Sequence, residues 1–305
     1  MAAIPSIKLN TGASIPAIGL GGGPSDFTLD AMAASEKWLL TGFQAGYRHF
    51  DTAVLYGTER YLGAALRTSG VKRDEVFITT KLPSHHQVYI DRSFNESLSN
   101  LGLDYVDLYL LHWPQTLEYP VCKISLRRSN FLIRTPTFND TWAEFERLHA
   151  SGRARAIGVS NFSIKTCVVV LSSPKIVPAV NQVELHPYLV QTELVEYCRK
   201  KGIVVAAYTP TGRDTVRNDP VIVALAAKYK ATTTQLILAW HLARGVVALP
   251  GSTNAERQKQ NLELPTLSTE DVDSITALDR GERTVMGRLG TDGKLAGWTA
   301  EQLGW

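Results

Sequence analysis

The chain has 305 residues, of which 44% are hydrophobic, and its formal net charge at pH 7 is only +3. This length fits one α/β barrel, a fold that commonly takes about 250 residues or more in a single domain, so we expect one domain over residues 1–305. Acidic and basic residues are spread along the whole chain, which argues against nucleic acid or an anionic membrane as the main partner.

The cysteines and the N-terminal segment indicate the cellular compartment in which the protein is expected. Cys122, Cys167 and Cys198 are few and widely spaced, which predicts no disulfide framework and fits a reducing environment. The first residues lack a basic region followed by a long apolar run, and no apolar stretch reaches the roughly 18 residues that span a bilayer. We therefore expect a cytoplasmic protein without a signal peptide or membrane span, and a monomer, with a dimer as the alternative.

Short apolar segments alternate with amphipathic segments along the chain. Residues 6–12 resemble one arm of a hairpin that leads into the first strand and covers a barrel floor. The predicted strands comprise residues 15–21, 47–53, 76–82, 105–112, 154–160, 179–185, 203–208 and 246–250. The predicted helices comprise residues 28–45, 58–69, 88–101, 139–151, 163–172, 191–201, 219–243 and 254–262. Because the βα units alternate without a break in composition, the sequence predicts a parallel sheet closed into a (β/α)8 TIM barrel.

Two segments depart from this repeat. Residues 115–139 follow the fourth strand and have little periodicity, so they predict a long functional loop on the face that carries barrel active sites. Residues 280–305 cannot form a ninth unit. Because this tail contains Trp298 and Trp305, we expect it to pack as a C-terminal lid over the barrel mouth, with a disordered terminus as the alternative.

Four polar side chains fall at the carboxyl ends of three consecutive predicted strands. Asp51 is in the last positions of the second strand and Tyr56 follows it, Lys81 is near the end of the third, and His112 ends the fourth. Adjacent strands lie about 5 Å apart, so these side chains can converge on one point. Each residue alone has an ordinary structural explanation, and it is their combination on one barrel face that predicts a catalytic site.

The chemistry of this combination favours proton transfer to a carbonyl group. A buried lysine needs an anion, which Asp51 supplies, and the ammonium of Lys81 is expected to lower the pKa of the Tyr56 phenol. Tyr56 can then act as general acid, while His112 donates a hydrogen bond that orients the carbonyl oxygen. The neighbouring pair His85 and His86 lacks metal-ligand spacing, and we expect no metal site.

Four segments, at residues 46–53, 106–114, 157–162 and 181–188, closely resemble the aldo-keto reductases, in the same order along the chain. The resemblance implies a nicotinamide-dependent carbonyl reductase on a TIM barrel, with Tyr56 as the general acid. It implies a catalytic tetrad made of Asp51, Tyr56, Lys81 and His112.

The resemblance also implies the residues that bind the cofactor. At the nicotinamide end these are Ser160, Asn161, Gln182 and Tyr208, whose amides, hydroxyl and aromatic face fix the position and plane of the ring. Beyond the last two strands, where barrels usually bind phosphate, the expected contacts are Thr209, Gly212, Ser252, Thr253, Arg257, Gln260 and Asn261. The expected cofactor is NADPH.

Two positions on the cofactor side depart from the commonest pattern of this family. Gly251 stands where a lysine is common, and Gln260 stands where a glutamate is common. Ser252 and Arg257 can still bind a 2′-phosphate, so we expect a weakened preference for NADPH, with NADH as the alternative cofactor.

The substrate side departs from the family as well. Gly22 and Gly23 replace a threonine and an aromatic residue, and Pro83 stands where a tryptophan is frequent. We therefore expect a roomier pocket walled by Leu55 and Trp113. Which aldehyde, ketone or sugar fits does not follow from these residues. Basic residues in the 115–139 segment fit either an anionic substrate or a solvated loop; they are Lys123, Arg127, Arg128 and Arg134.

We expect an oxidoreductase that reduces an aldehyde or ketone to an alcohol by hydride transfer from NAD(P)H, with a small-molecule carbonyl substrate and no nucleic-acid partner. Two alternatives stay open. One is a cofactor-binding scaffold or sensor subunit on the same barrel without turnover, against which the complete tetrad argues. The other is a barrel isomerase or aldolase that binds phosphate, in which the residues expected to bind the carboxamide would have no task.

Overall fold

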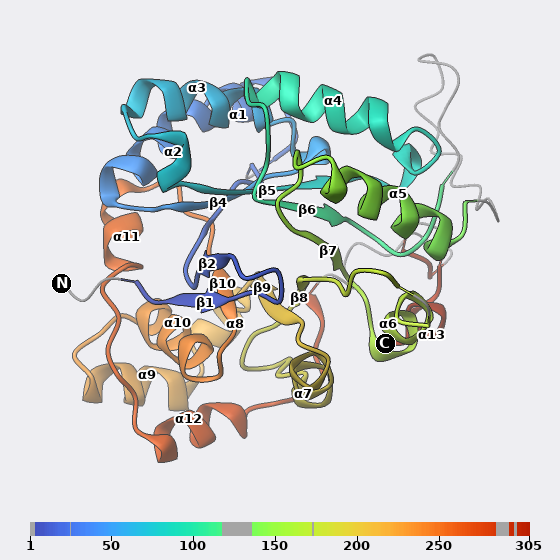
Figure 1. Ribbon diagram of the computed structural model, residues 1–305. Helices are drawn as coiled ribbons and strands as arrows, with labels where there is room; N and C mark the ends of the chain where they lie inside the picture. Colours follow the sequence, from blue (N-terminus) through green and yellow to red (C-terminus); the bar gives the residue numbers. More distant parts are fainter. Residues whose placement is uncertain (1–3, 25, 118–135, 173, 285–292, 296–297) are drawn as a thin grey trace.

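The computed structural model describes residues 4–24, 26–117, 136–172, 174–284, 293–295 and 298–305, and Figure 1 labels its helices and strands. Within these residues, β1 (Ser6–Lys8) and β2 (Ser14–Pro16) form a small antiparallel sheet. Eight further strands form one parallel sheet in chain order. They are β3 (Leu20–Gly21), β4 (His49–Asp51), β5 (Phe77–Leu82), β6 (Leu108–Leu111), β7 (Ile157–Ser160), β8 (Val180–Glu184), β9 (Val204–Tyr208) and β10 (Val247–Leu249).

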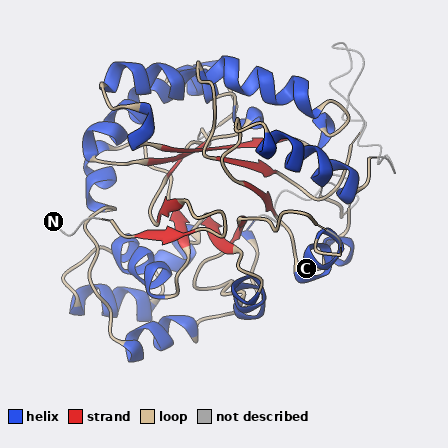
Figure 2. Ribbon diagram, viewed as in Figure 1, coloured by secondary structure: helices blue, strands red, loops and turns tan. Residues whose placement is uncertain are grey.

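The parallel sheet closes on itself. Ile18, just before β3, forms a parallel bridge with Ala248 of β10. The amides of Gly19 and Gly21 donate hydrogen bonds to the carbonyls of Ala248 and Pro250, at 2.9 and 3.0 Å. Figure 2 shows the strands at the centre with the helices outside them. The predicted (β/α)8 barrel is therefore confirmed.

The N-terminal hairpin closes one end of the barrel. Ile7 of β1 pairs with Ile15 of β2, and Ile15 is fully buried. Leu9 and Ile15 belong to one apolar cluster with residues of the barrel strands, among them Leu108 and Val247. The hairpin and its position at the barrel floor are thus confirmed, but the predicted first strand at residues 15–21 divides, since its first part belongs to the hairpin.

Helices cover the outside of the sheet. In the described residues they are α1 (Leu29–Ala33), α2 (Ser35–Ala45), α3 (Glu59–Ser69), α4 (Ile90–Leu101), α5 (Phe138–Ala150), α6 (Ile164–Val170), α7 (Thr192–Lys200), α8 (Arg213–Arg217), α9 (Pro220–Lys228), α10 (Thr233–Ala243), α11 (Ala255–Gln260), α12 (Thr269–Thr276) and α13 (Ala300–Leu303). Three short 3-10 helices are η1 (Val54–Tyr56), η2 (Arg73–Glu75) and η3 (Ser84–His86).

Two predicted helices are each divided into two. The helix expected at residues 219–243 breaks into α9 and α10, because Lys230 takes a left-handed backbone with φ of 51° and Thr232 begins a new helix with a capping box to Gln235. The helix expected at residues 28–45 likewise divides into α1 and α2 at Ala34. The sequence analysis did not predict α8, α12 or α13.

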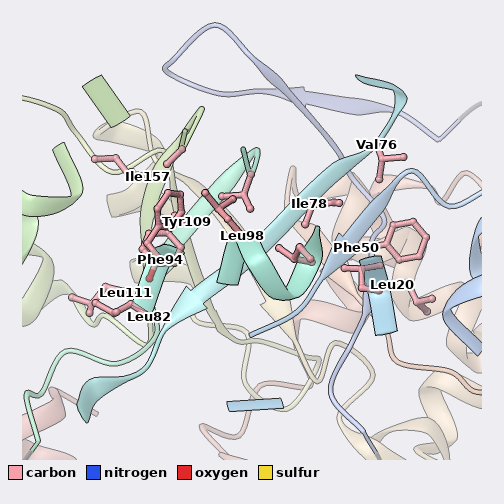
Figure 3. Close-up of a cluster of buried hydrophobic side chains, with 14 of the residues drawn as sticks. Leu20, Phe50, Val76, Ile78, Leu82, Phe94, Leu98, Tyr109, Leu111 and Ile157 are labelled. Atoms are coloured by element: carbon pink, nitrogen blue, oxygen red, sulfur yellow. The ribbon is translucent and has the colours of Figure 1, made fainter. Parts of the chain in front are cut away.

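The strands alternate between an outer face that packs on helices and an inner face that turns into the barrel. Phe50 faces outward and stacks on Phe43 of α2, with ring centroids 4.0 Å apart, while its neighbour Asp51 contacts the inner Lys81. Figure 3 shows part of this outer core, where Ile78 and Tyr109 lie with Phe94 of α4 between sheet and helices. This alternation places Asp51 and Lys81 inside the barrel.

The tail packs where a lid was expected, as far as the structure describes it. The Trp113 and Trp305 rings lie 5.9 Å apart, and Leu303 joins the same apolar cluster. The Gln115 side-chain amide donates to the Leu295 carbonyl at 3.1 Å. Most of the predicted 115–139 loop, with Lys123, Arg127, Arg128 and Arg134, lies outside the described residues, as does Cys122. Among the described helices, none combines the length and the apolar character that crossing a bilayer requires.

Candidate active site

A cavity of about 830 Å³ opens at the carboxyl ends of the parallel strands. The strand ends that line it include those of β3, β4, β7, β9 and β10. Most of the residues that the sequence predicted for the site line this cavity; they are Asp51, Leu55, Tyr56, His112, Trp113, Ser160, Asn161, Gln182, Tyr208, Thr209, Ser252, Arg257 and Asn261. The barrel therefore gathers residues that lie far apart in the sequence.

An ion pair between Lys81 and Asp51 lies at the tetrad end of the cavity. The Lys81 ammonium donates to both carboxylate oxygens of Asp51, at 2.8 and 2.7 Å, and to the carbonyl of Thr52 at 2.9 Å. Lys81 is fully buried, and Asp51 is nearly so. Burial lowers the pKa of Lys81, while the charges of Asp51 and Glu59 oppose this shift. The pair thus holds a cation at a position that water does not reach.

Tyr56 and His112 complete the predicted tetrad. The Lys81 ammonium nitrogen lies 4.8 Å from the centroid of the Tyr56 ring. The imidazole of His112 packs edge-on against the same ring, with centroids 5.7 Å apart. A phenol beside a cation and an imidazole can give a proton to a carbonyl oxygen, because the cation stabilises the negative charge left on the phenol oxygen.

Glu59 is a buried acidic residue next to this group that the sequence analysis missed. Only 3% of it is exposed, and it accepts hydrogen bonds from the Thr80 hydroxyl at 2.7 Å and the Asn100 amide at 3.3 Å. Burial raises its pKa, and its charge acts on Lys81. Glu59 begins α3, a position where acidic residues are ordinary, so the sequence contained no signal for its burial.

A chain of hydrogen bonds joins the predicted carboxamide-binding residues to the tetrad. The Tyr208 hydroxyl donates to Asn161 Oδ1 at 2.8 Å, and Asn161 Nδ2 lies 3.2 Å from Ser160 Oγ. Ser160 donates to the Gln182 carbonyl at 2.8 Å, and the Gln182 side chain donates to Asp51 Oδ1 at 2.7 Å. These amide and hydroxyl groups are therefore held in fixed positions along the cavity wall.

The side of the cavity next to β9 and β10 is positively charged. Arg257 was predicted there, and Arg213 and Arg217, which the sequence analysis did not single out, line the same cavity. Among the described lining residues, Asp51 is the one acidic side chain, and it is paired with Lys81. Arg217 forms an ion pair with Asp214 of its own helix at 2.6 Å, so Arg213 and Arg257 are the two guanidinium groups that best suit a ligand that carries phosphate.

Three predicted cofactor residues do not line the cavity. Gly212 has a left-handed backbone with φ of 60°, and a Cβ there would lie 2.3 Å from a methyl group of Val216. The role that the structure shows for Gly212 is therefore to form the turn before α8. Thr253 is exposed on the loop before α11, and the Gln260 amide lies 3.4 Å from a carboxylate oxygen of Glu256. Contacts of these residues with a cofactor stay predictions.

The substrate side differs in part from the expectation of a missing aromatic wall. Gly23 lines the cavity, whereas Gly22 and Pro83 are not among its lining residues. Phe27 lines it too, and 60% of this side chain is exposed. An aromatic residue is therefore present on this side, a few positions after Gly23. No pattern identified it, because an exposed phenylalanine in the loop between β3 and α1 has no periodic partner.

Further lining residues are small or come from loops. Pro210, Thr211, Leu249, Pro250 and Gly251 belong to the segments after the last two strands where the cofactor was expected, whereas the sequence analysis did not place Gly21, Pro24, Thr234 or Thr284 in the site. Thr284 belongs to the tail, and its amide donates to the buried carboxylate of Glu184 at 2.7 Å. Within the described residues, no cluster of histidine, cysteine and acidic side chains could hold a metal ion.

Comparison with known proteins gives consistent matches over nearly the whole chain. The model of the aldo/keto reductase family matches residues 18–280. The chain is 41% identical over 302 residues to glycerol 2-dehydrogenase (NADP(+)) of Saccharomyces cerevisiae, covering 92% of this chain and 93% of that protein. It is also 41% identical over 288 residues to the aldehyde reductase YPR1 of the same yeast, covering 90% and 91%. A crystal structure of an aldo-keto reductase complexed with NADPH superposes with a TM-score of 0.84 at 33% identity, covering 92% of this chain and 90% of that one.

Proposed function

Because this chain belongs to the aldo/keto reductase family, we propose that it reduces an aldehyde or a ketone to the alcohol with NADPH as the reductant. The single observation that carries this proposal is the buried Lys81–Asp51 pair beside the Tyr56 ring at the wall of the large cavity. The names of two relatives, an NADP(+) glycerol dehydrogenase and an aldehyde reductase, agree with this chemistry.

The cavity has the chemistry that a nicotinamide dinucleotide phosphate requires. Arg213 and Arg257 offer cations for its phosphate groups, while Arg217 is paired with Asp214. Gly21 allows close approach of the backbone, since a Cβ there would lie 2.9 Å from the Leu249 carbonyl oxygen. The hydrogen-bonded row that includes Asn161 would hold the carboxamide, and Tyr208 offers an aromatic face for the ring. When bound in this cavity, NADPH supplies the hydride for the carbonyl carbon.

The chain's own residues supply the proton and the electrostatics. We assign Tyr56 as the general acid, which gives the proton of its hydroxyl to the carbonyl oxygen of the substrate. Lys81 stabilises the resulting charge on the Tyr56 oxygen, and Asp51 keeps Lys81 charged in its buried position. His112, edge-on to the Tyr56 ring, is placed to donate a hydrogen bond to the same carbonyl oxygen.

The predicted cofactor preference also belongs to this proposal. Gly251 lines the cavity and offers no cation, while Arg213 and Arg257 line it near the same strands. We infer that these arginines replace much of the lost lysine charge, so that NADPH is preferred over NADH. The alternative of a scaffold without turnover gains no support from the described site, in which all four predicted catalytic residues are in contact or adjacent.

We further propose a single-domain, monomeric, cytoplasmic enzyme without a nucleic-acid partner. One closed barrel contains the whole parallel sheet, and Cys167 and Cys198 are buried free thiols, as expected in a reducing compartment. Light scattering of the purified protein tests the monomer, which predicts a mass near 33.5 kDa.

The proposed reaction is tested with purified protein, NADPH or NADH, and a panel of aldehydes, ketones and sugars. The expected result is loss of reduced-nicotinamide absorbance with at least one class of carbonyl compound, together with the matching alcohol by mass spectrometry. If no compound of the panel is reduced with either cofactor although NADPH binds, the scaffold alternative replaces the proposal.

A further inference from the structure

Gly21, Gly22 and Gly23 are consecutive, but the structure requires glycine at only two of the three positions. A Cβ at Gly21 would lie 2.9 Å from the Leu249 carbonyl oxygen, and one at Gly22 would lie 2.4 Å from the Asp51 carbonyl oxygen. Backbone atoms cannot move aside cheaply, so both positions exclude a side chain. At Gly23 the nearest atom to a Cβ is Tyr56 Cε2, at 4.0 Å, and the backbone is not left-handed.

Gly23 therefore has no conformational or packing requirement among the described residues. A glycine outside special backbone regions costs conformational entropy on folding without any gain in contacts. What glycine provides at this position is empty space beside the ring of Tyr56, inside the cavity. A side chain on residue 23 would project into the space where a substrate lies when its carbonyl oxygen meets the Tyr56 hydroxyl.

The lining of the cavity that contains this space includes several apolar side chains. Phe27 is 60% exposed and Leu55 is 42% exposed, although both line the cavity. Pro24 and the half-buried Trp113 line the same cavity. Exposed apolar side chains grouped in a concave site mark a surface that a ligand covers, since covering them releases ordered water.

We propose that Gly23 and Phe27 are specificity-determining residues, and that the preferred substrate carries a bulky apolar group, such as an aryl ring, on its carbonyl carbon. This inference depends on the proposed carbonyl reduction. The space beside Tyr56 receives the bulky group, and Phe27, Leu55 and Trp113 cover it. A ketone fits as well as an aldehyde, because the side chain that would crowd the second substituent is missing at residue 23.

A polyhydroxylated substrate suits this wall less well. Each hydroxyl group that leaves water without a hydrogen-bond partner costs free energy, about 1–3 kcal/mol in proteins. Among Gly23, Pro24, Phe27 and Leu55, no side chain can donate or accept a hydrogen bond. Trp113, the other residue that we assign to this wall, has a single polar group, its indole N–H, so most hydroxyl groups of such a substrate would lack a partner there.

The test compares kcat/KM for three carbonyl compounds: acetophenone as the aryl ketone, propanal as the small aldehyde, and dihydroxyacetone as the polar ketone. The variants are Gly23→Ala, Gly23→Leu and Phe27→Ala. Leu29→Ala is the matched control, because Leu29 is 81% exposed in the same segment and is not among the cavity-lining residues.

We expect the wild-type protein to prefer acetophenone over dihydroxyacetone. Gly23→Leu fills the space, so it lowers kcat/KM for acetophenone roughly tenfold or more relative to propanal, and Gly23→Ala has a smaller effect in the same direction. Phe27→Ala removes an apolar wall and also lowers the acetophenone-to-propanal ratio, whereas Leu29→Ala leaves this ratio unchanged. Circular dichroism and NADPH binding confirm that each variant is folded.

Two results overturn the inference while the proposed function stands. One is a wild-type preference for dihydroxyacetone over acetophenone, and the other is a Gly23→Leu variant in which all three kcat/KM values fall equally. Failure of the proposed function gives a different result, since neither propanal nor any other carbonyl compound is then reduced by the wild-type protein.

Discussion

The buried Lys81–Asp51 pair leads to the most quantitative prediction, through the variants Asp51→Asn, Lys81→Met and the double variant. Lys81 has three acceptors within 2.9 Å, two of which are the Asp51 carboxylate oxygens. Asp51→Asn leaves a fully buried ammonium group without its paired carboxylate, so that of the two acidic residues whose charges act on it only Glu59 remains. Removing one partner of a buried pair costs about 3–5 kcal/mol in the free energy of unfolding. The same cost is expected for Lys81→Met, which leaves the Asp51 carboxylate with only the Gln182 amide among its side-chain donors described here.

The double variant removes both charges together. The double variant loses the hydrogen bond from Lys81 to the Thr52 carbonyl and part of the hydrogen bond from Gln182 to residue 51. These losses cost about 1–3 kcal/mol in the free energy of unfolding. The sum of the two single effects should therefore exceed the effect of the double variant by a coupling energy of at least about 2 kcal/mol. Activity should stay low in all three variants, because each of them removes the charged Lys81 or the anion that keeps it charged.

Guanidinium denaturation at pH 7 measures the free energies, and NADPH oxidation measures activity on the same samples. Additive effects in the double variant would contradict the reasoning, since they would mean that the two charges do not interact in the folded protein. A single Asp51→Asn variant with wild-type stability and wild-type turnover would contradict it as well.

Two further predictions concern the cofactor and pH. Arg257→Ala and Arg213→Ala should each raise the Kd for NADPH about tenfold, which corresponds to about 1.4 kcal/mol of binding free energy, as measured by tryptophan fluorescence. The control variant Arg199→Ala changes an exposed arginine outside the cavity and should leave the Kd unchanged. An unchanged Kd in both cavity variants would show that these arginines do not hold phosphate. Burial lowers the pKa of His49 from 6.5 to about 4, so between these values the unfolded chain binds a proton that the folded chain does not. Stability that is present above pH 6.5 is therefore lost as the pH falls, by about 2 kcal/mol at pH 5 for this group, and His49→Gln should lose less stability than the wild type between pH 7 and pH 5. Equal pH dependence of the two proteins in denaturation experiments would refute this assignment.

The barrel could be predicted from the sequence because its strands are buried on both faces. Such strands appear as short, nearly continuous apolar runs, and all eight were found in order. Strand ends then placed Asp51, Lys81 and His112 on one face, since parallel strands share their direction. The register of neighbouring strands brings these residues together, and the observed contacts join Lys81 to Asp51 and His112 to Tyr56.

Features that depend on tertiary contacts could not be predicted in the same way. The break between α9 and α10 rests on the left-handed Lys230, a residue type that gives no turn signal. The arginines of α8 belong to a helix of only five residues, too short for a periodic pattern. Phe27 is exposed in the cavity and Glu59 is buried next to the tetrad. Tertiary contacts decide both placements, and no local sequence pattern reports them.

The role of Tyr56 as proton donor is the central claim, and Tyr56→Phe tests it most directly. This substitution keeps the ring that lies against Lys81 and His112 and removes only the hydroxyl group. The decisive measurement is kcat at saturating NADPH, together with the Kd for NADPH of the same variant. The account predicts that kcat falls by a factor of about 100–10,000 while the Kd changes little. Turnover by Tyr56→Phe at the wild-type rate would contradict it.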